Sequence, residues 1–156
     1  MRSPFLLISL HFQYGTLMPL MERSPYHSLY AKQSSMNKIN ISEKFELFSE
    51  EWTPKVIAES NGQLVKIAKG SGELVWHKHD NEDELFIVFK GQLTLQLKSG
   101  DVVLNAGEMY VVAKGVEHCP KAKPDTHFMM VEPASTAHTG NIESELTVAP
   151  DQQEWI

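Results

Sequence analysis

The sequence has a single cysteine and few basic residues. These features argue against a protein stabilised by disulfides and against a nucleic-acid-binding protein. Cys119 is the single cysteine among 156 residues, so no disulfide can form within the chain, and a reducing, cytoplasmic location is expected. Fourteen Lys and Arg residues stand against twenty Asp and Glu, which gives a net charge of −6. Nucleic-acid binding depends on clustered basic side chains, so this balance argues against a nucleic-acid partner. No arginine follows Arg23, which counts against a pocket for a phosphorylated substrate.

Long apolar runs are also missing. No segment approaches the roughly 18 apolar residues that a membrane-spanning helix needs, so no membrane partner is expected. The N-terminal run Phe5–Leu10 is short and lacks a small-residue cleavage site, so a signal peptide is the minority interpretation. Residues 1–35 show no sustained period, and Met36 opens a segment of different character. We therefore expect a disordered extension or an over-long start over residues 1–35, and a single domain over residues 36–156.

Helical periodicity is missing as well, because no run of ten or more residues shows a persuasive 3.6-residue period. Short apolar segments instead alternate with turn residues every eight to twelve residues, which is typical of a sandwich or barrel. Asn61-Gly62 is a strong hairpin signal because both residues accept the positive φ of a type I′ turn. Ile39–Ser49 fits either a short strand or a single helical turn, and Pro120–Asp125 is expected to be a polar loop. The sequence therefore predicts an all-β fold, a compact barrel or jelly roll.

The expected strands cover most of the domain from Lys55 to Glu132. They are Val56–Ala58, Leu64–Ala68, Leu74–His79, Glu84–Phe89, Leu93–Leu97, Asp101–Leu104, Met109–Val112, Val116–His118 and His127–Glu132.

The short segment Trp76–Glu84 contains His77, His79 and Glu84, and it precedes the strand-like run Leu85–Phe89. Alternate side chains of a strand share a face, so His77 and His79 are expected to project to the same side. A short polar turn would bring Glu84 beside them on the next strand. Two imidazoles and a carboxylate that converge on one point favour a transition metal. The plain alternative is a pair of unrelated surface histidines.

Two short motifs extend this pattern, and through them the chain resembles the cupin superfamily. The first reads His77-x-His79, four residues, Glu84, six residues, Gly91, and the second reads Gly107, five residues, Ala113-Lys114-Gly115, two residues, His118. Three positions depart from the family pattern. Four residues separate Gly72 from His77 where five are usual, Ala113 replaces a common proline, and Ala122 replaces a common asparagine. These departures concern turns and loops, and all four ligand positions remain filled.

The resemblance implies a cupin-type double-stranded β-helix, a jelly-roll barrel, that binds one divalent metal ion through His77, His79, Glu84 and His118. Such a donor set suits Fe, Mn, Ni, Cu or Zn, and leaves coordination positions for water or substrate. Small one-domain proteins of this kind are often grouped with the mannose-6-phosphate-isomerase-like cupins. The function expected from the resemblance is that of a small metalloenzyme, of isomerase or dioxygenase type, acting on a small oxygenated metabolite. The alternative is a non-catalytic module that holds a small ligand or a metal.

Two further residues are weak catalytic candidates. His127 shares a strand face with Met129 and Val131, so it is either a group beside the metal site, such as a general base, or a hydrogen-bonded core histidine. Tyr110 either donates a proton in the pocket or fills the barrel, and the second role is the more common one.

The expected partners are a small-molecule ligand or substrate and a second copy of the chain. A homodimer is expected because the edge strands of such a barrel are commonly covered by a partner. The polar tail ends in Trp155-Ile156, which is expected to dock against Trp52 or a partner subunit.

Overall fold

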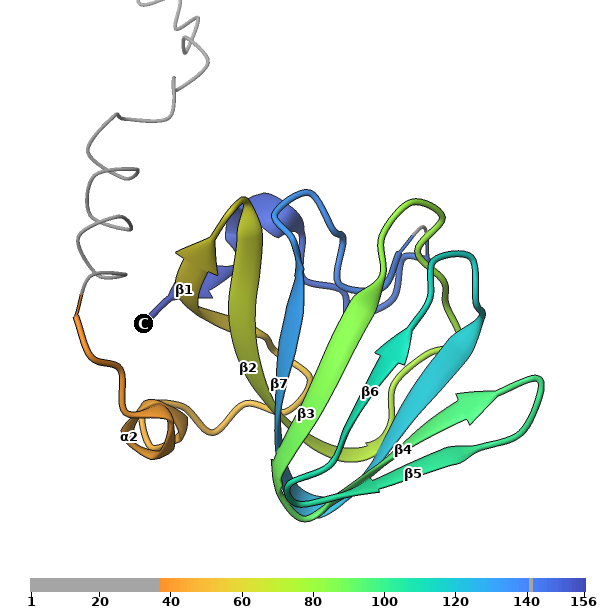
Figure 1. Ribbon diagram of the computed structural model, residues 1–156, viewed down its shortest axis with the longest axis horizontal. Coiled ribbons are helices and arrows are strands. Elements are labelled where there is room, and N and C mark those ends of the chain that lie inside the picture. The colour runs from red at the N-terminus through yellow and green to blue at the C-terminus, as the bar shows by residue number, and fades with distance from the viewer. Residues whose placement is uncertain (1–36, 141) are drawn as a thin grey trace, which may run out of the picture.

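The computed structural model describes residues 37–140 and 142–156, and regular structure there is almost entirely β-strand (Figure 1). The expectation for residues 1–35 lies outside the described residues. The helices are α2 (Ile41–Phe45) and the 3-10 helix η1 (Pro150–Gln152). The all-β prediction is confirmed. Within the two described ranges, no helix has the length and apolarity needed to cross a membrane.

Eight strands form one sheet, which folds back on itself. They are β1 (Lys55–Ser60), β2 (Gln63–Glu73), β3 (Glu84–Lys90), β4 (Gln92–Leu97), β5 (Val102–Asn105), β6 (Met109–Val112), β7 (His118–Pro133) and β8 (Glu154–Trp155). The strand order is β5-β4-β7-β2-β1-β8, and β3 joins β7 and β6. Figure 1 shows β1, β2, β7, β3 and β6 side by side, with β4 and β5 at the right.

The long strand β7 explains how the sheet closes. Its first part, from His118 to Ala122, pairs with β4, whereas its second part, from His127 to Val131, pairs with β3. The strand pairs β4–β5 and β3–β6 are therefore joined to the same strand β7, and together they enclose an apolar interior. This inner core consists of Trp52, Ala68, Phe86, Val88, Leu93, Leu95, Leu104, Val112, Ala122, Phe128 and Met130.

Two turns depend on residues that accept positive φ. Asn61 and Gly62 join β1 to β2 with φ values of 53° and 76°, which agrees with the predicted hairpin. Gly91 joins β3 to β4 with φ 78°, and a Cβ atom there would lie 2.5 Å from Oγ1 of Thr126. Only glycine fits such a close approach, so Gly91 allows β3 and β4 to reach the same strand β7.

The opposite face of β2 and β7 carries a smaller outer core, formed by Phe45, Phe48, Ile57, Ile67 and Met129. The helix α2 supplies Phe45 to this core, so the segment that the sequence left open contains a helical turn. Asn40 caps it, because its Oδ1 accepts hydrogen bonds from the backbone N–H groups of Ser42 and Glu43. The C-terminal tail docks at the same side. There β8 pairs with β1, and Ile156 packs against the outer core.

Three predicted segments were wrong. Of the expected strand Val116–His118 only His118 lies in a strand, because β7 begins there. The expected strand Leu74–His79 is not a strand, because β2 ends at Glu73 and His77 forms only an isolated bridge with His118. The expected loop Pro120–Asp125 belongs to β7. A proline lacks the N–H group but keeps its carbonyl, and the Pro120 carbonyl accepts a hydrogen bond of 2.9 Å from the Leu74 N–H.

Candidate metal centre

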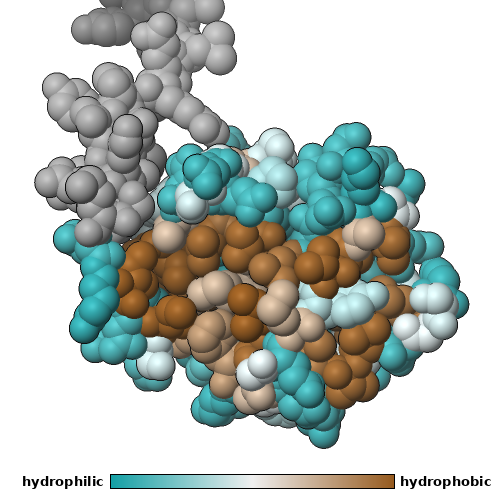
Figure 2. All heavy atoms as spheres, in the orientation of Figure 1, coloured by the Kyte–Doolittle hydropathy of each residue, from teal (hydrophilic) through white to brown (hydrophobic). Residues whose placement is uncertain are grey.

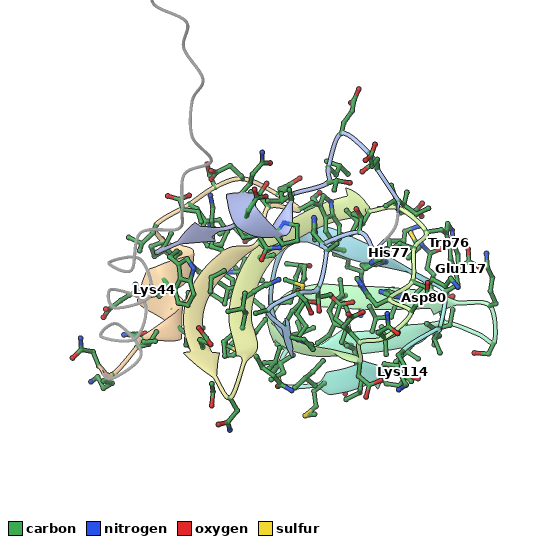
Figure 3. All side chains as sticks on the ribbon, turned by 90° about the horizontal axis from the view of Figure 1, so that it is seen from above. Lys44, Trp76, His77, Asp80, Lys114 and Glu117 are labelled. Carbon is green, nitrogen blue, oxygen red and sulfur yellow. The ribbon has the colours of Figure 1, made fainter. Side chains whose placement is uncertain are left out.

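The structure brings the four predicted ligands together. His77 and His79 lie in the loop between β2 and β3, Glu84 is the first residue of β3, and His118 is the first residue of β7. Each offers one ligand atom, and these four atoms lie within 4.8 Å of one another. All four side chains are buried, so the group differs from an acidic patch on the surface. Figure 3 shows His77 with Trp76 and Glu117 at the end of the molecule opposite α2.

Backbone hydrogen bonds fix two of the imidazole rings. The amides and carbonyls of His77 and His118 bond to each other at 2.9 Å, which places the two rings side by side, with centroids 4.3 Å apart. Nδ1 of His77 lies 2.8 Å from the Val75 carbonyl, and Nδ1 of His118 lies 3.0 Å from the Val116 carbonyl. Such bonds select the tautomer that leaves Nε2 free as a ligand atom.

Glu84 lies between the other ligands. Its Oε2 is 3.2 Å from Nε2 of His118 and 3.4 Å from Nε2 of His79. Nε2 of His79 is buried and makes no geometrically good hydrogen bond within the described residues. A buried nitrogen lone pair beside a carboxylate oxygen is the donor arrangement that a divalent cation completes.

The protonation states suit a cation. Burial alone would raise the pKa of Glu84, but the hydrogen bond to His118 and the adjacent His79 imidazole hold that pKa well below its usual range. Burial, together with the neighbouring His118, lowers the pKa of His77 to about 4. At neutral pH the carboxyl group is therefore ionised and the His77 imidazole neutral, which are the forms that bind metal ions.

A small cavity adjoins the cluster, with room for about one water molecule. Its polar lining is supplied by His77, Glu84 and His138, and apolar residues such as Phe86 and Met130 line the rest. His138 lies in a segment of the sequence without any pattern. No local signal would have placed it here, because its position follows from how the chain returns after β7.

A buried Lys–Glu pair inside the barrel was also missed. Nζ of Lys66 lies 2.5 Å from Oε1 of Glu132, and both side chains are buried. A sequence signal existed for both residues. Lys66 alternates with Leu64 and Ala68 on the inner face of β2, and Glu132 continues the inner row of Phe128 and Met130 on β7.

The two weak catalytic candidates lie elsewhere. His127 does not enter the barrel, because it faces the outer core, where its ring stacks on Phe45 at 4.6 Å and its Nε2 lies 3.1 Å from Asp125. Of the two roles considered for His127, a place in the metal pocket is wrong, since adjacent residues of a strand face opposite sides and Phe128 occupies the inner side, whereas the alternative of a buried core histidine agrees with the structure. Tyr110 packs against the inner core and is not among the residues that line the cavity.

Comparisons with known proteins agree with this architecture. The sequence model of the family described as Cupin domain matches residues 63–140. The uncharacterized protein YdbB of Bacillus subtilis is 36% identical over 77 residues, which cover 49% of this chain and 68% of that protein.

Solved structures show the same similarity. The crystal structure of a cupin-2 domain containing protein from Shewanella frigidimarina is 48% identical, with a TM-score of 0.60 over 61% of this chain and 93% of that chain. Protein NMB1881 from Neisseria meningitidis is 26% identical, with a TM-score of 0.58 over 62% of this chain and 99% of that chain.

Proposed function

Since the chain belongs to the cupin family, we propose that it holds one divalent transition metal ion through His77, His79, Glu84 and His118. The observation that carries this proposal is the buried cluster of four donor atoms within 4.8 Å. A fully buried carboxylate needs a compensating charge, and the side chains in contact with Glu84 here are imidazoles. Fe, Mn, Ni, Cu and Zn all suit three imidazoles and one carboxylate.

The proposed activity is that of a small metalloenzyme, of isomerase or dioxygenase type, with a small oxygenated metabolite as substrate. A bound metal ion would supply Lewis acidity or, as Fe(II), dioxygen chemistry. The protein holds the ligand atoms in place and surrounds the cavity with apolar side chains such as Phe86, Phe128 and Met130, which exclude water.

The mannose-6-phosphate-isomerase-like group remains a finer proposal for this chain. A phosphorylated substrate needs a free cationic side chain in the pocket. Lys66 is the lysine buried in the barrel, and it already pairs with Glu132. The substrate class that fits this interior better is therefore an oxygenated metabolite without a phosphate group.

A non-catalytic binding module is the second candidate. The observation in its favour is the size of the cavity, which holds about one water molecule and would admit a metal ion more readily than a metabolite. Turnover distinguishes the two candidates. An enzyme loses turnover when Glu84 is replaced by Gln, whereas a binding module shows ligand affinity without turnover.

We also propose a cytoplasmic location. Cys119 is buried and unpaired, and burial raises the pKa of its thiol, so it is poorly suited to forming a disulfide with another chain.

Elemental analysis tests the metal site. Protein purified without an affinity tag or chelator is expected to carry about one metal ion per chain, and His79→Ala and His118→Ala to lose it. Both variants should keep the sheet, because the inner core rests on Phe, Leu and Val side chains. His127→Ala is the matched control, since His127 faces the outer core, and it should retain the metal.

Absence of metal from the unmodified protein, even after reconstitution, would remove the proposal. Unchanged metal content in His118→Ala would show that the fourth ligand is wrong. Circular dichroism of each variant separates loss of metal from loss of fold.

A further inference from the structure

His138 is a buried histidine beside the metal centre that does not belong to it. Its side chain is 6% exposed and borders the same small cavity as His77 and Glu84. Nδ1 of His138 is buried and has no hydrogen-bond partner among the described residues. Native proteins rarely leave a buried polar atom unpaired, so an unpaired nitrogen at the wall of a cavity indicates a partner that the cavity receives.

The segment that carries His138 is seated on the loop that carries His77 and His79. Gly140 approaches the Lys78 backbone so closely that a Cβ atom would lie 2.1 Å from the Lys78 carbonyl oxygen. Thr139 stabilises the same segment through a local hydrogen bond, because its Oγ1 donates to the Ile142 carbonyl at 2.6 Å. These contacts place His138 at the wall of the same cavity as the proposed ligands His77 and Glu84.

Glu132 provides a second unpaired polar atom on the inner face. Leu85 pairs with Val131, so Glu84 and Glu132 occupy neighbouring positions on β3 and β7. Oε1 of Glu132 bonds to Lys66, whereas Oε2 is buried and has no hydrogen-bond partner among the described residues. Glu132 therefore neighbours the ligand Glu84 across the sheet, whereas His138 is the residue with an unpaired nitrogen that also lines the cavity.

The net charge of this interior determines whether a cationic or an anionic ligand is favoured. A divalent metal ion and Lys66 contribute positive charge, Glu84 contributes one negative charge, and the imidazoles count as neutral ligands. The sum is positive whether Glu132 is ionised or protonated. An uncompensated buried charge is costly, so a metal-loaded interior favours an anion.

We propose that His138 forms the second half of a ligand site whose first half is the metal centre, and that this site takes a small carboxylate with a neighbouring hydroxyl group. The hydroxyl and carboxylate oxygens match the open coordination positions, and Nδ1 of His138 forms a hydrogen bond to the same ligand. The cavity is small, so entry of the ligand requires the segment that carries His138 to move outward. This inference rests on the proposed metal centre.

The test uses the full chain loaded with Co(II), whose visible absorption reports ligand binding, and glycolate as the probe. Glycolate is expected to change the spectrum of the unmodified protein and to bind about tenfold more weakly to His138→Ala, the loss of about one hydrogen bond. His138→Gln, which keeps a polar group, should recover part of the affinity. His127→Ala is the matched control on the outer face and should bind glycolate as the unmodified protein does. Cobalt content should be the same in all four proteins.

Each result bears on the inference. Equal glycolate affinity in the unmodified protein and His138→Ala would overturn it, and so would a cobalt spectrum that glycolate leaves unchanged. In both cases the metal centre itself would stand. Loss of cobalt from His138→Ala would overturn it differently, because His138 would then be a metal ligand. Failure of the unmodified protein to bind cobalt would remove the proposed function and this inference with it. If His138→Ala does not fold, the comparison with His138→Gln decides.

Discussion

Glu132 keeps a carboxyl group inside the barrel, where ionisation is unfavourable. Burial, and then the neighbouring Glu84, raise the pKa of Glu132 to about 8, although the Lys66 ammonium group opposes the shift. The unfolded chain has the ordinary pKa of 4.5 for this group. Between these values the folded protein binds more protons than the unfolded chain, so the free energy of unfolding falls as the pH rises through this range.

This linkage gives a pH prediction. From pH 7 to pH 8 the metal-free protein should lose about 1 kcal/mol of unfolding free energy through Glu132, and Glu132→Gln should remove that loss. The amide oxygen of the variant can still accept the hydrogen bond from Lys66. His77 and His138, whose pKa burial lowers to about 4, contribute little to the slope in this range. Urea denaturation at the two pH values measures it, and equal slopes in both proteins would contradict the role of Glu132.

The sequence predicted the residues that have a local pattern and missed those that tertiary structure positions. His77, His79 and Glu84 share one short stretch, and the resemblance to the cupin superfamily added His118 through its second motif. His138 had no such spacing. For His127 the two alternatives stayed open because alternation defines which residues share a face but not which face is the interior.

At the scale of elements, the loop between β2 and β3 shows why the expected strand failed. Alternation over Leu74–His79 is compatible with a strand, but a strand also needs a neighbour with free backbone groups. The register of β2 against β7 shifts between Gly70 and Gly72. After Glu73 the chain makes only isolated backbone hydrogen bonds to β7, from Leu74 and between His77 and His118. The loop can then turn across the end of the barrel, which brings His77 and His79 to Glu84. A regular strand over these residues would have kept His77 and His79 within the sheet, away from Glu84.

The strand β8 gives a prediction at the same scale. The Ile156 N–H donates a hydrogen bond of 3.1 Å to the Val56 carbonyl, and the Ile156 side chain packs on the outer core. Deletion of Trp155 and Ile156 should lower the free energy of unfolding by about 1 to 3 kcal/mol, because apolar area returns to water. Chemical denaturation measures the change. Ile142→Ala, at an exposed isoleucine, should cost much less, and an unchanged midpoint in the deletion variant would show that the tail does not contribute.

At the scale of the whole molecule, the turn signals predicted the class of fold better than they predicted which strands pair. Glycine and asparagine turns are local, so the succession of short strands could be read directly. The pairing of β7 with β2, β3 and β4 joins segments far apart in the chain, and local residues do not encode it. The resemblance to the cupin superfamily supplied that arrangement, and the structure confirms it.

The outer face of the sheet carries two apolar rows that cross four strands. One row joins Val111, Leu85, Val131 and Val65, and the other joins Met109, Ile87, Met129 and Ile67. The helix α2 and the tail cover the end of the rows on β2, whereas Met109 and Val111 on β6 are 57% and 46% exposed. Figure 2 shows this face as a continuous hydrophobic band. Apolar patches of this extent are uncommon on monomers.

We propose that a second copy of the chain covers this band. Neither row contains a charged residue, so two copies related by a two-fold axis can place the same patch against itself without burying an unpaired charge. Light scattering at micromolar concentration should therefore give the mass of a dimer. Met109→Lys combined with Val111→Lys should give a monomer with unchanged circular dichroism, because these side chains do not contribute to the inner core. Val103→Lys, at an exposed valine on β5 outside both rows, should remain a dimer. A monomeric unmodified protein would overturn the proposal, and a dimer that survives the double substitution would place the interface on another face.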